Sequence, residues 1–337
     1  MRETVRLTQP TEILDLTLIA TPLGDSSSPQ EIQLAIEGQF RPQQFPLDSG
    51  KVKYGVTGGM LQFHLKDAHF TSLSTEISNY LPISKFPTVD HPTWKFALPT
   101  GSEVLNNTLE NIPLGTIATA SPKWSLEANF TVAQSDLLII ESEGLWRHDL
   151  RPNKQAVLHR KIALFLLAFI LPSPLISLEM NQSTQGGLLS SVEPPQIDTK
   201  DLLATLERVK QATSDNFLDL CQIANLNPQS DFTGANLRGT TLRGLDLNRA
   251  QWSRVNLRGA DLTDIDLSES NLQRAKLSGA DLSGAYLSNA NLKEADLHRA
   301  SLALANLSGA KLQGANLEET NLSQTNLNDC EWDLESS

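Results

Sequence analysis

The stretch ADLSG at residues 280–284 is one copy of a five-residue unit that recurs without a break from Phe232 to Trp332. A large apolar residue occupies all 21 positions at this spacing, and 18 of them are Leu. The residue two places earlier is Ala in 12 of the 21 units, and the residue directly before the apolar one is Asn or Asp in 14. A fixed short period over a long stretch is typical of a repeat architecture.

A period of five fits neither regular secondary structure. A helix has 3.6 residues per turn and would spread the Leu positions around its surface. A flat strand alternates its faces, so Leu237 and Leu242 would point in opposite directions. The abundant Asn, Asp, Gly and Ser also disfavour both long helices and flat strands. The pattern is satisfied if the backbone turns a corner every five residues, so that every Leu points toward one axis.

Residues 230–333 closely resemble the pentapeptide-repeat family, because the A-(N/D)-L-x-x unit runs through them in register. The resemblance implies a right-handed β-helix of square section, a quadrilateral β-helix with four units per coil, and so about five coils here. Residues twenty apart would then stack at about 4.8 Å, the spacing between strands. The lead-in FLDLCQIANLNPQSDFTGANL, at 217–237, looks like the capping segment that precedes many cyanobacterial repeats of this kind.

The charge balance argues against general nucleic-acid binding. The net charge is −12 over 337 residues. Residues 230–337 contain 15 acids and 10 bases, and the remainder contains 24 acids and 17 bases. Neither part is basic, so no direct nucleic-acid partner is expected. The two cysteines, Cys221 and Cys330, occupy positions expected to be buried, and no disulfide framework is indicated.

Residues 1–150 are expected to form an all-β, sandwich-like domain. Short apolar or alternating runs lie between Pro, Gly, Ser and Asp clusters, at 13–20, 32–37, 59–65, 94–98, 124–132 and 137–141. His64, Asp67 and His69 match no zinc spacing that we can defend, and ordinary strand and turn positions explain them better. Residues 55–59 (GVTGG) lack the end of a phosphate-binding loop and are read as a hairpin turn. No catalytic set, metal site, cofactor site or small-molecule substrate is evident, so we do not expect an enzyme.

Residues 157–178 are a candidate single membrane-spanning helix. Residues 162–178 contain no charge, and a basic run precedes them. Pro172 and Pro174 weaken the assignment, but membrane helices tolerate proline near an end. The positive-inside rule would place residues 1–160 in the cytoplasm and the repeats in the periplasm or thylakoid lumen. The alternative is a buried core segment or an interfacial anchor, and with it a soluble cytoplasmic protein.

Between this segment and the repeats, residues 181–197 have the composition of a polar linker. The pattern becomes helical at 198–229, with Leu202, Leu206 and Val209 on one face. Because the open end of a solenoid exposes apolar surface and unpaired backbone, we expect these helices to cap the first coil.

In a rod with a filled interior, function depends on the outward positions. Residues 230–276 contain seven bases and six acids, whereas 277–337 contain three bases and nine acids. The basic end is a candidate surface for an anionic protein or lipid headgroup, formed by Arg238, Arg243, Arg249, Arg254, Arg258 and Arg274. The simpler interpretation is a solvated face with local pairs to Asp246, Asp264 and Glu269.

Three functions remain in competition. The first is a non-enzymatic, membrane-anchored scaffold that presents a rigid rod to a protein partner. The second is a DNA mimic that regulates a type II topoisomerase, a role the resemblance implies for some family members, which look like longer and more acidic rods. The third is a ligand-binding or enzymatic activity in residues 1–150.

Overall fold

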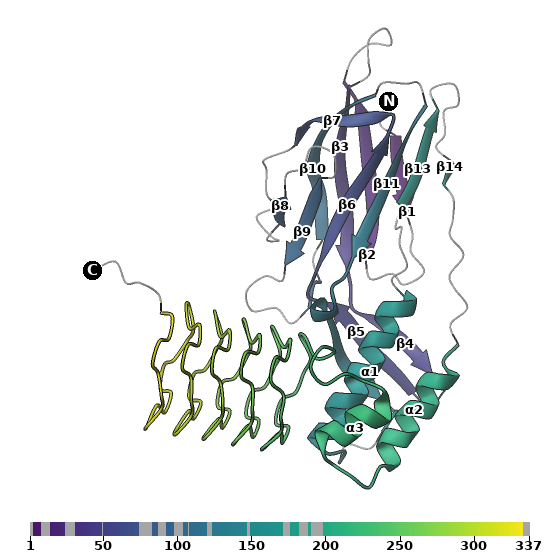
Figure 1. Ribbon diagram of the computed structural model, residues 1–337. Coiled ribbons are helices and arrows are strands. Elements are labelled where there is room, and N and C mark those ends of the chain that lie inside the picture. The colour runs from purple at the N-terminus through teal and green to yellow at the C-terminus, as the bar shows by residue number, and fades with distance from the viewer. Residues whose placement is uncertain are drawn as a thin grey trace. The chain divides into compact units, whose positions relative to one another are not determined.

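The computed structural model describes residues 3–7, 14–23, 31–48, 50–73, 83–86, 92–97, 104–106, 108–119, 123–146, 149–170, 176–181, 188–189 and 198–332. The chain divides into two compact units. The first comprises residues 1–46, 51–141 and 166–197, and the second comprises residues 47–50, 142–165 and 198–337. Figure 1 shows the arrows of the β-rich first unit, and the helices and successive coils of the second.

The chain is mainly β with few helices, as expected. Each of the six strand runs predicted in residues 1–150 overlaps an observed strand. The strands are β1 (Glu3–Leu7), β2 (Leu14–Pro22), β3 (Glu31–Phe40), β4 (Gln43–Leu47), β5 (Gly50–Val56), β6 (Gly58–Lys66), β7 (Ala68–Leu73), β8 (Ile83–Phe86), β9 (Thr93–Ala97), β10 (Thr108–Thr119), β11 (Lys123–Thr131), β12 (Leu137–Glu143), β13 (Ile176–Asn181) and β14 (Leu188–Leu189). The helices are η1 (Gln134–Asp136), α1 (Pro152–Ile170), α2 (Lys200–Gln211) and α3 (Phe217–Ala224).

Two antiparallel sheets share an aromatic core in the first unit. Their strand orders are β1-β2-β3-β10-β7 and β14-β13-β11-β6-β9-β8, and a smaller sheet has the order β12-β5-β4. Phe40 of β3 contacts Phe96 of β9 and Phe130 of β11, with ring centroids 5.6 Å and 5.8 Å apart. Phe70 of β7 contacts Trp94 of β9 at 6.1 Å. These contacts join the inner faces of the two large sheets, as in a β-sandwich.

The segment at residues 55–59 is not a hairpin turn. Strand β5 ends at Val56 and pairs within the three-stranded sheet, whereas β6 begins at Gly58 and belongs to the six-stranded sheet. The chain therefore passes from one sheet to another at Thr57. A Cβ on Gly59 would lie 2.2 Å from the Phe130 ring, so this glycine is required by the packing of the aromatic core.

Helix α1 and strand β13 replace the membrane span predicted over residues 157–178. The helix ends at Ile170, and from Ile176 the chain is a strand that pairs with β11, with Leu178 opposite Leu126. Strand β14 then pairs with β13 inside the predicted 181–197 linker. No helix in the described part of the chain is both long and apolar enough to cross a membrane. The predicted span is wrong, and the predicted orientation, which depended on it, falls with it.

Residues 152–165 of α1 instead form part of the core of the second unit. Val157, Leu158 and Ile162 are fully buried. The same helix also buries two polar side chains, Asn153 and Arg160, each only 3% exposed. A run of apolar residues is the same in sequence whether lipid or protein surrounds it, but a lipid-facing helix would not bury Asn and Arg in this way.

Asn153 and Arg160 bind backbone groups of the first coil and of the segment that precedes α3. Asn153 Nδ2 donates to the carbonyl oxygens of Asp215 and Thr241, both at 2.9 Å, and Asn153 Oδ1 accepts from the Thr241 N–H at 3.0 Å. Arg160 Nε donates to the carbonyl oxygen of Asp231. Burial lowers the pKa of Arg160 to about 10, and the Asp231 carboxylate opposes this shift. Helix α1 therefore satisfies backbone groups that have no preceding coil to pair with.

Helices α2 and α3 occupy the region expected to form the cap. Asn216 is the N-cap of α3, and its side chain accepts hydrogen bonds from the N–H groups of Leu218 and Asp219. Phe217 of α3 contacts Phe232 and Trp252 of the first coils, with ring centroids 4.9 Å and 6.2 Å apart. Trp252 Nε1 donates to the Pro228 carbonyl at 2.8 Å, which satisfies the indole inside this apolar cluster.

The repeat stack, residues 230–332, has the predicted twenty-residue register. Parallel bridges join residues twenty apart, from Asn236↔Asn256 to Lys311↔Glu331. For example, the Leu257 N–H donates to the Lys276 carbonyl at 2.8 Å. The repeated Leu residues from Leu237 to Leu307 are fully buried, and each contributes about 1.5–3 kcal/mol by leaving water. Up to Leu307 the interior is thus filled by side chains and only outward positions meet solvent, whereas in the last coil Leu317, Leu322, Leu327 and Trp332 are partly exposed.

Candidate interaction surface

The corners of the repeat stack explain which residues point outward. The second residue after each repeated Leu has a positive φ, as at Gly239, Arg249 and Asp264. At such a corner the N–H of the next residue donates to the Leu carbonyl, for example Thr240 to Leu237 at 3.3 Å. This is the geometry of a type II turn, which requires a left-handed residue at its third position. The two residues after each Leu therefore lie on the outside.

The recurrent Asn or Asp has a local role at each corner. Its side-chain oxygen accepts a hydrogen bond from the backbone N–H two residues later, as in Asn236 to Arg238 at 3.3 Å and Asp281 to Ser283 at 3.0 Å. Asn and Asp form this turn more readily than other residues. The side chain thus orients the backbone that carries the outward residues, and the surface is rigidly displayed.

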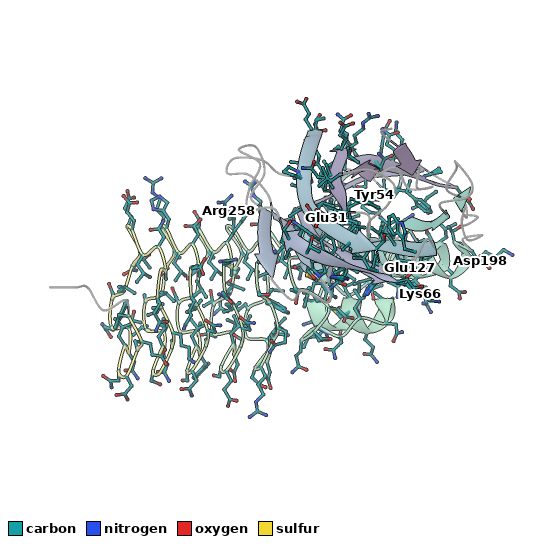
Figure 2. The ribbon with its side chains drawn as sticks, turned by 90° about the horizontal axis from the view of Figure 1, so that it is seen from above. Glu31, Tyr54, Lys66, Glu127, Asp198 and Arg258 are labelled. Atoms are coloured by element: carbon teal, nitrogen blue, oxygen red, sulfur yellow. The ribbon has the colours of Figure 1, made fainter. Side chains whose placement is uncertain are left out.

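The structure places Arg238 and Arg258 one above the other. The Gly239 N–H donates to the Arg258 carbonyl, so the two arginines occupy neighbouring coils. Both are exposed, and Figure 2 labels Arg258 among the side chains that project from the coils. Arg258 Nη2 reaches Asp296 Oδ2 at 3.4 Å. Among the described residues, no ion pair involves Arg238, so its charge is directed to solvent.

Arg254 and Arg274 share the adjacent corner, since Arg274 lies twenty residues after Arg254. Arg274 forms a bidentate pair with Glu294 on the next coil, with distances of 2.7 Å and 3.2 Å. This hydrogen bonding raises the pKa of the Arg274 guanidinium and lowers the pKa of the Glu294 carboxyl. The guanidinium is therefore held against the carboxylate of the next coil, although its side chain is half exposed.

Two other predicted arginines are also paired within the stack. Arg243 Nη2 lies 3.4 Å from Asp264 Oδ2, and Arg249 Nε lies 2.9 Å from Glu269 Oε2. Local pairs to Asp264 and Glu269 were the simpler interpretation of the sequence. Exposed pairs of this kind contribute little to stability, so their main effect is to neutralise each other's charge.

Sequence reasoning named Glu269 but missed Glu294 and Glu319, the carboxylates that complete a regular series. Arg249–Glu269, Arg274–Glu294 and Arg299–Glu319 each join residues twenty apart, and each pair begins twenty-five residues after the last. All six residues have positive φ and stand at corners. The sequence contains the signal for these pairs. Because one coil takes twenty residues, an Arg and a Glu twenty residues apart lie on neighbouring coils and are expected to form an ion pair.

Candidate sites in the first unit gain no support. His64 lies in β6, Asp67 has φ 61° at the connection to β7, and His69 lies in β7. Over the ranges that the structure describes, no group of three or more His, Cys, Asp or Glu side chains is arranged to hold a metal ion. Cys221 is buried, and burial raises the pKa of its thiol, so it behaves as a core residue.

Comparison with known proteins connects the repeats to one family. The family described as pentapeptide repeats matches the chain in eight copies, over residues 230–268, 251–289, 270–309 and 305–331. A search of curated proteins found no match.

Three solved structures illustrate the similarity. The pentapeptide repeat protein Rfr23 from the cyanobacterium Cyanothece 51142 is 44% identical over 26% of this chain and 60% of its own, with a TM-score of 0.26. A pentapeptide repeat protein from Nostoc PCC 7120 is 35% identical over 26% of this chain and 77% of its own, with a TM-score of 0.18. A pentapeptide repeat protein from the thylakoid lumen of Arabidopsis thaliana is 28% identical over 29% of this chain and 64% of its own, with a TM-score of 0.26. The chain therefore spans about three fifths of the length of the first of these relatives.

Proposed function

Because this chain belongs to the pentapeptide-repeat family, we propose that it is a non-enzymatic interaction scaffold whose repeat stack presents a rigid recognition surface to a protein partner. The observation that carries the proposal is the filled interior of the stack. Its repeated Leu residues are buried from Leu237 to Leu307, and its corners are fixed by hydrogen bonds, so over these coils the outward side chains are the groups available to a partner. The twenty-residue register supports the right-handed quadrilateral β-helix of about five coils that the family resemblance implies.

We place the partner-binding surface at the basic first coils, around Arg238 and Arg258. Both side chains are exposed on neighbouring coils. Arg258 lies 3.4 Å from Asp296, and Arg243, Arg249 and Arg274 are also paired with carboxylates of the stack, so the surface is centred on the charge of Arg238. An acidic protein surface is the partner that this arrangement favours, since opposite charge accelerates encounter and fixes register.

The two competing functions receive less support. A DNA mimic needs a continuous acidic face, but Glu269, Glu294 and Glu319 are each neutralised by an arginine twenty residues earlier. In the first unit, no group of described residues is arranged to hold a metal ion, which weighs only against a metal-dependent activity there.

Charge reversal tests the proposal. The purified chain, the double variant Arg238→Glu/Arg258→Glu and the control Lys293→Glu/Lys311→Glu would each be immobilised and exposed to lysate of the source organism. Quantitative mass spectrometry would then compare what each one retains. We expect a protein that wild type and control enrich equally, that the Arg238/Arg258 variant loses by about tenfold, and that salt releases. An identical set of captured proteins for wild type and the Arg238/Arg258 variant would overturn the proposal.

A further inference from the structure

One face of the later coils carries no charge at all. Three successive coils contribute residues 283–288, 303–308 and 323–328, and none of these residues is Asp, Glu, Lys, Arg or His. We call these three segments the neutral face. The same positions on the two preceding coils contain Arg243, Asp246, Asp264 and Asp266. The neutral face is therefore a local departure from the charged surface of the stack.

Two large apolar side chains are exposed on the neutral face. Tyr286 is 55% exposed and Leu304 is 65% exposed. They lie on adjacent coils, because Tyr286 pairs with Asn306, and Leu304 is two residues before Asn306. Small residues surround them, including Gly284 and Ala303, which are joined by a backbone hydrogen bond of 2.8 Å. A Tyr and a Leu standing above small neighbours form the kind of anchor found at the centre of protein interfaces.

Leu304 stands in an unfavourable backbone conformation. Its φ is 63°, and among the described non-glycine residues with positive φ it is the only apolar one. Gly244 and Gly284 occupy the same corner on other coils. A Leu in the left-handed region has a strained backbone, and a Leu that is mainly exposed gains little from burial. A contact with another molecule therefore explains the presence of Leu304 better than a role in the fold.

The polar groups of the neutral face are self-complementary. They are hydroxyls and amides, which both donate and accept hydrogen bonds. Asn326 Nδ2 donates to Asn306 Oδ1 at 2.9 Å, and Asn306 Nδ2 donates to Ser288 Oγ at 3.0 Å, so the face is ordered before any partner arrives. Two copies of a chain with a net charge of −12 repel each other. The neutral face removes the local part of that repulsion.

We propose that the neutral face binds the neutral face of a second copy of this chain, in a two-fold arrangement that covers Tyr286 and Leu304. At about 4.8 Å between coils, three coils present a contact on the order of 300 Å² per copy, well under the ~800 Å² of a standard interface. The dimer is therefore weak and forms only at high protein concentration. Because no ion pairs form across the neutral face, salt does not dissociate the dimer and instead screens the remaining repulsion between the two chains. Binding of an acidic partner to Arg238 and Arg258 would respond to salt in the opposite direction.

Sedimentation velocity of the full chain tests this, from about 1 µM to about 200 µM and between roughly 50 mM and 500 mM NaCl. Leu304→Gly is the decisive variant, since glycine relieves the left-handed backbone and keeps the fold. Glu319→Gly is the control at another left-handed corner, with φ 56°. We expect a reversible dimer for wild type and control, and at least tenfold weaker association for Leu304→Gly, with unchanged circular dichroism.

Tyr286→Ser should weaken association to a similar extent. A monomer at every concentration would overturn the proposal. So would a dimer that Leu304→Gly and Tyr286→Ser leave unchanged, or one that salt dissociates.

Discussion

Replacing Asn153 by Ala should loosen the start of the repeat stack. The side chain is 3% exposed and makes three hydrogen bonds, to the Asp215 carbonyl and to both backbone groups of Thr241. Each such bond contributes about 1 kcal/mol net, and a buried backbone group left without a partner costs about 1–3 kcal/mol more. Water reaches part of this region, because Thr241 itself is exposed, so we expect a loss of ~3–5 kcal/mol rather than the full sum.

Hydrogen exchange measured by mass spectrometry locates the effect. In the full chain, a loss of ~3 kcal/mol speeds exchange about a hundredfold where local opening limits it. We expect this increase in peptides covering residues 237–245 and 153–163, and no change at 281–300. Asn328→Ala is the matched control, since Asn328 is exposed, and it should change local stability by less than about 0.5 kcal/mol.

Asn153→Asp separates hydrogen bonding from packing. Aspartate keeps the size and the acceptor for the Thr241 N–H, but it presents a carboxylate oxygen to two carbonyl oxygens. We expect it to be at least as damaging as Ala at neutral pH, and to recover in part when acid protonates the carboxyl. If exchange at 237–245 were no faster in Asn153→Ala than in Asn328→Ala, helix α1 would not be capping the first coil.

Three further predictions concern the second unit. His159 is buried against Trp146, with its ring 3.2 Å from Ser142 Oγ, and burial lowers its pKa from 6.5 to about 4. The neutral imidazole therefore contributes fully to the free energy of unfolding above pH 6.5, and this contribution is lost as the pH falls through 4. Urea unfolding should show that the free energy of unfolding falls by about 1–3 kcal/mol between pH 6.5 and 4, and that His159→Phe removes most of this pH dependence. An equally steep pH dependence in the variant would show that His159 is not its source. Gly259→Ala should cost about 1–2 kcal/mol in urea unfolding, purely from its φ of 63°, because nothing lies within 4 Å of the added Cβ; a neutral result would mean that the corner relaxes. Arg274→Ala should cost less than about 1 kcal/mol by the same measurement, since its pair with Glu294 is exposed, and a larger loss would show that the corner pairs act cooperatively.

The repeat stack was predictable because its sequence period is strict. One Leu every five residues leaves few backbone paths that bury them all, and the observed register of twenty agrees with that reasoning. Strand β10 was missed, although it pairs with both β3 and β7. It contains Pro113 and Gly115, and its pairing register with β3 shifts between these two residues, so neither alternation nor composition marks it as a strand.

Helix α1 shows why hydrophobicity alone misled the interpretation. Its apolar residues match a membrane span, but the information that decides the matter lies in two polar residues. Asn153 and Arg160 are seven apart and therefore lie on one face of the helix. Both are buried against backbone groups of the same unit, which the sequence does not reveal because their partners lie 62 to 88 residues away.

The twenty-residue register also limits how this protein can change length. Inserting one unit of five residues rotates everything downstream by a quarter of a coil, so Arg249 would no longer face Glu269 if the insertion fell between them. Inserting four units restores the register and adds one complete coil. Length variation that preserves function should therefore come in whole coils. A change of one unit would move every later outward residue to a different face, while the leucine interior stays intact.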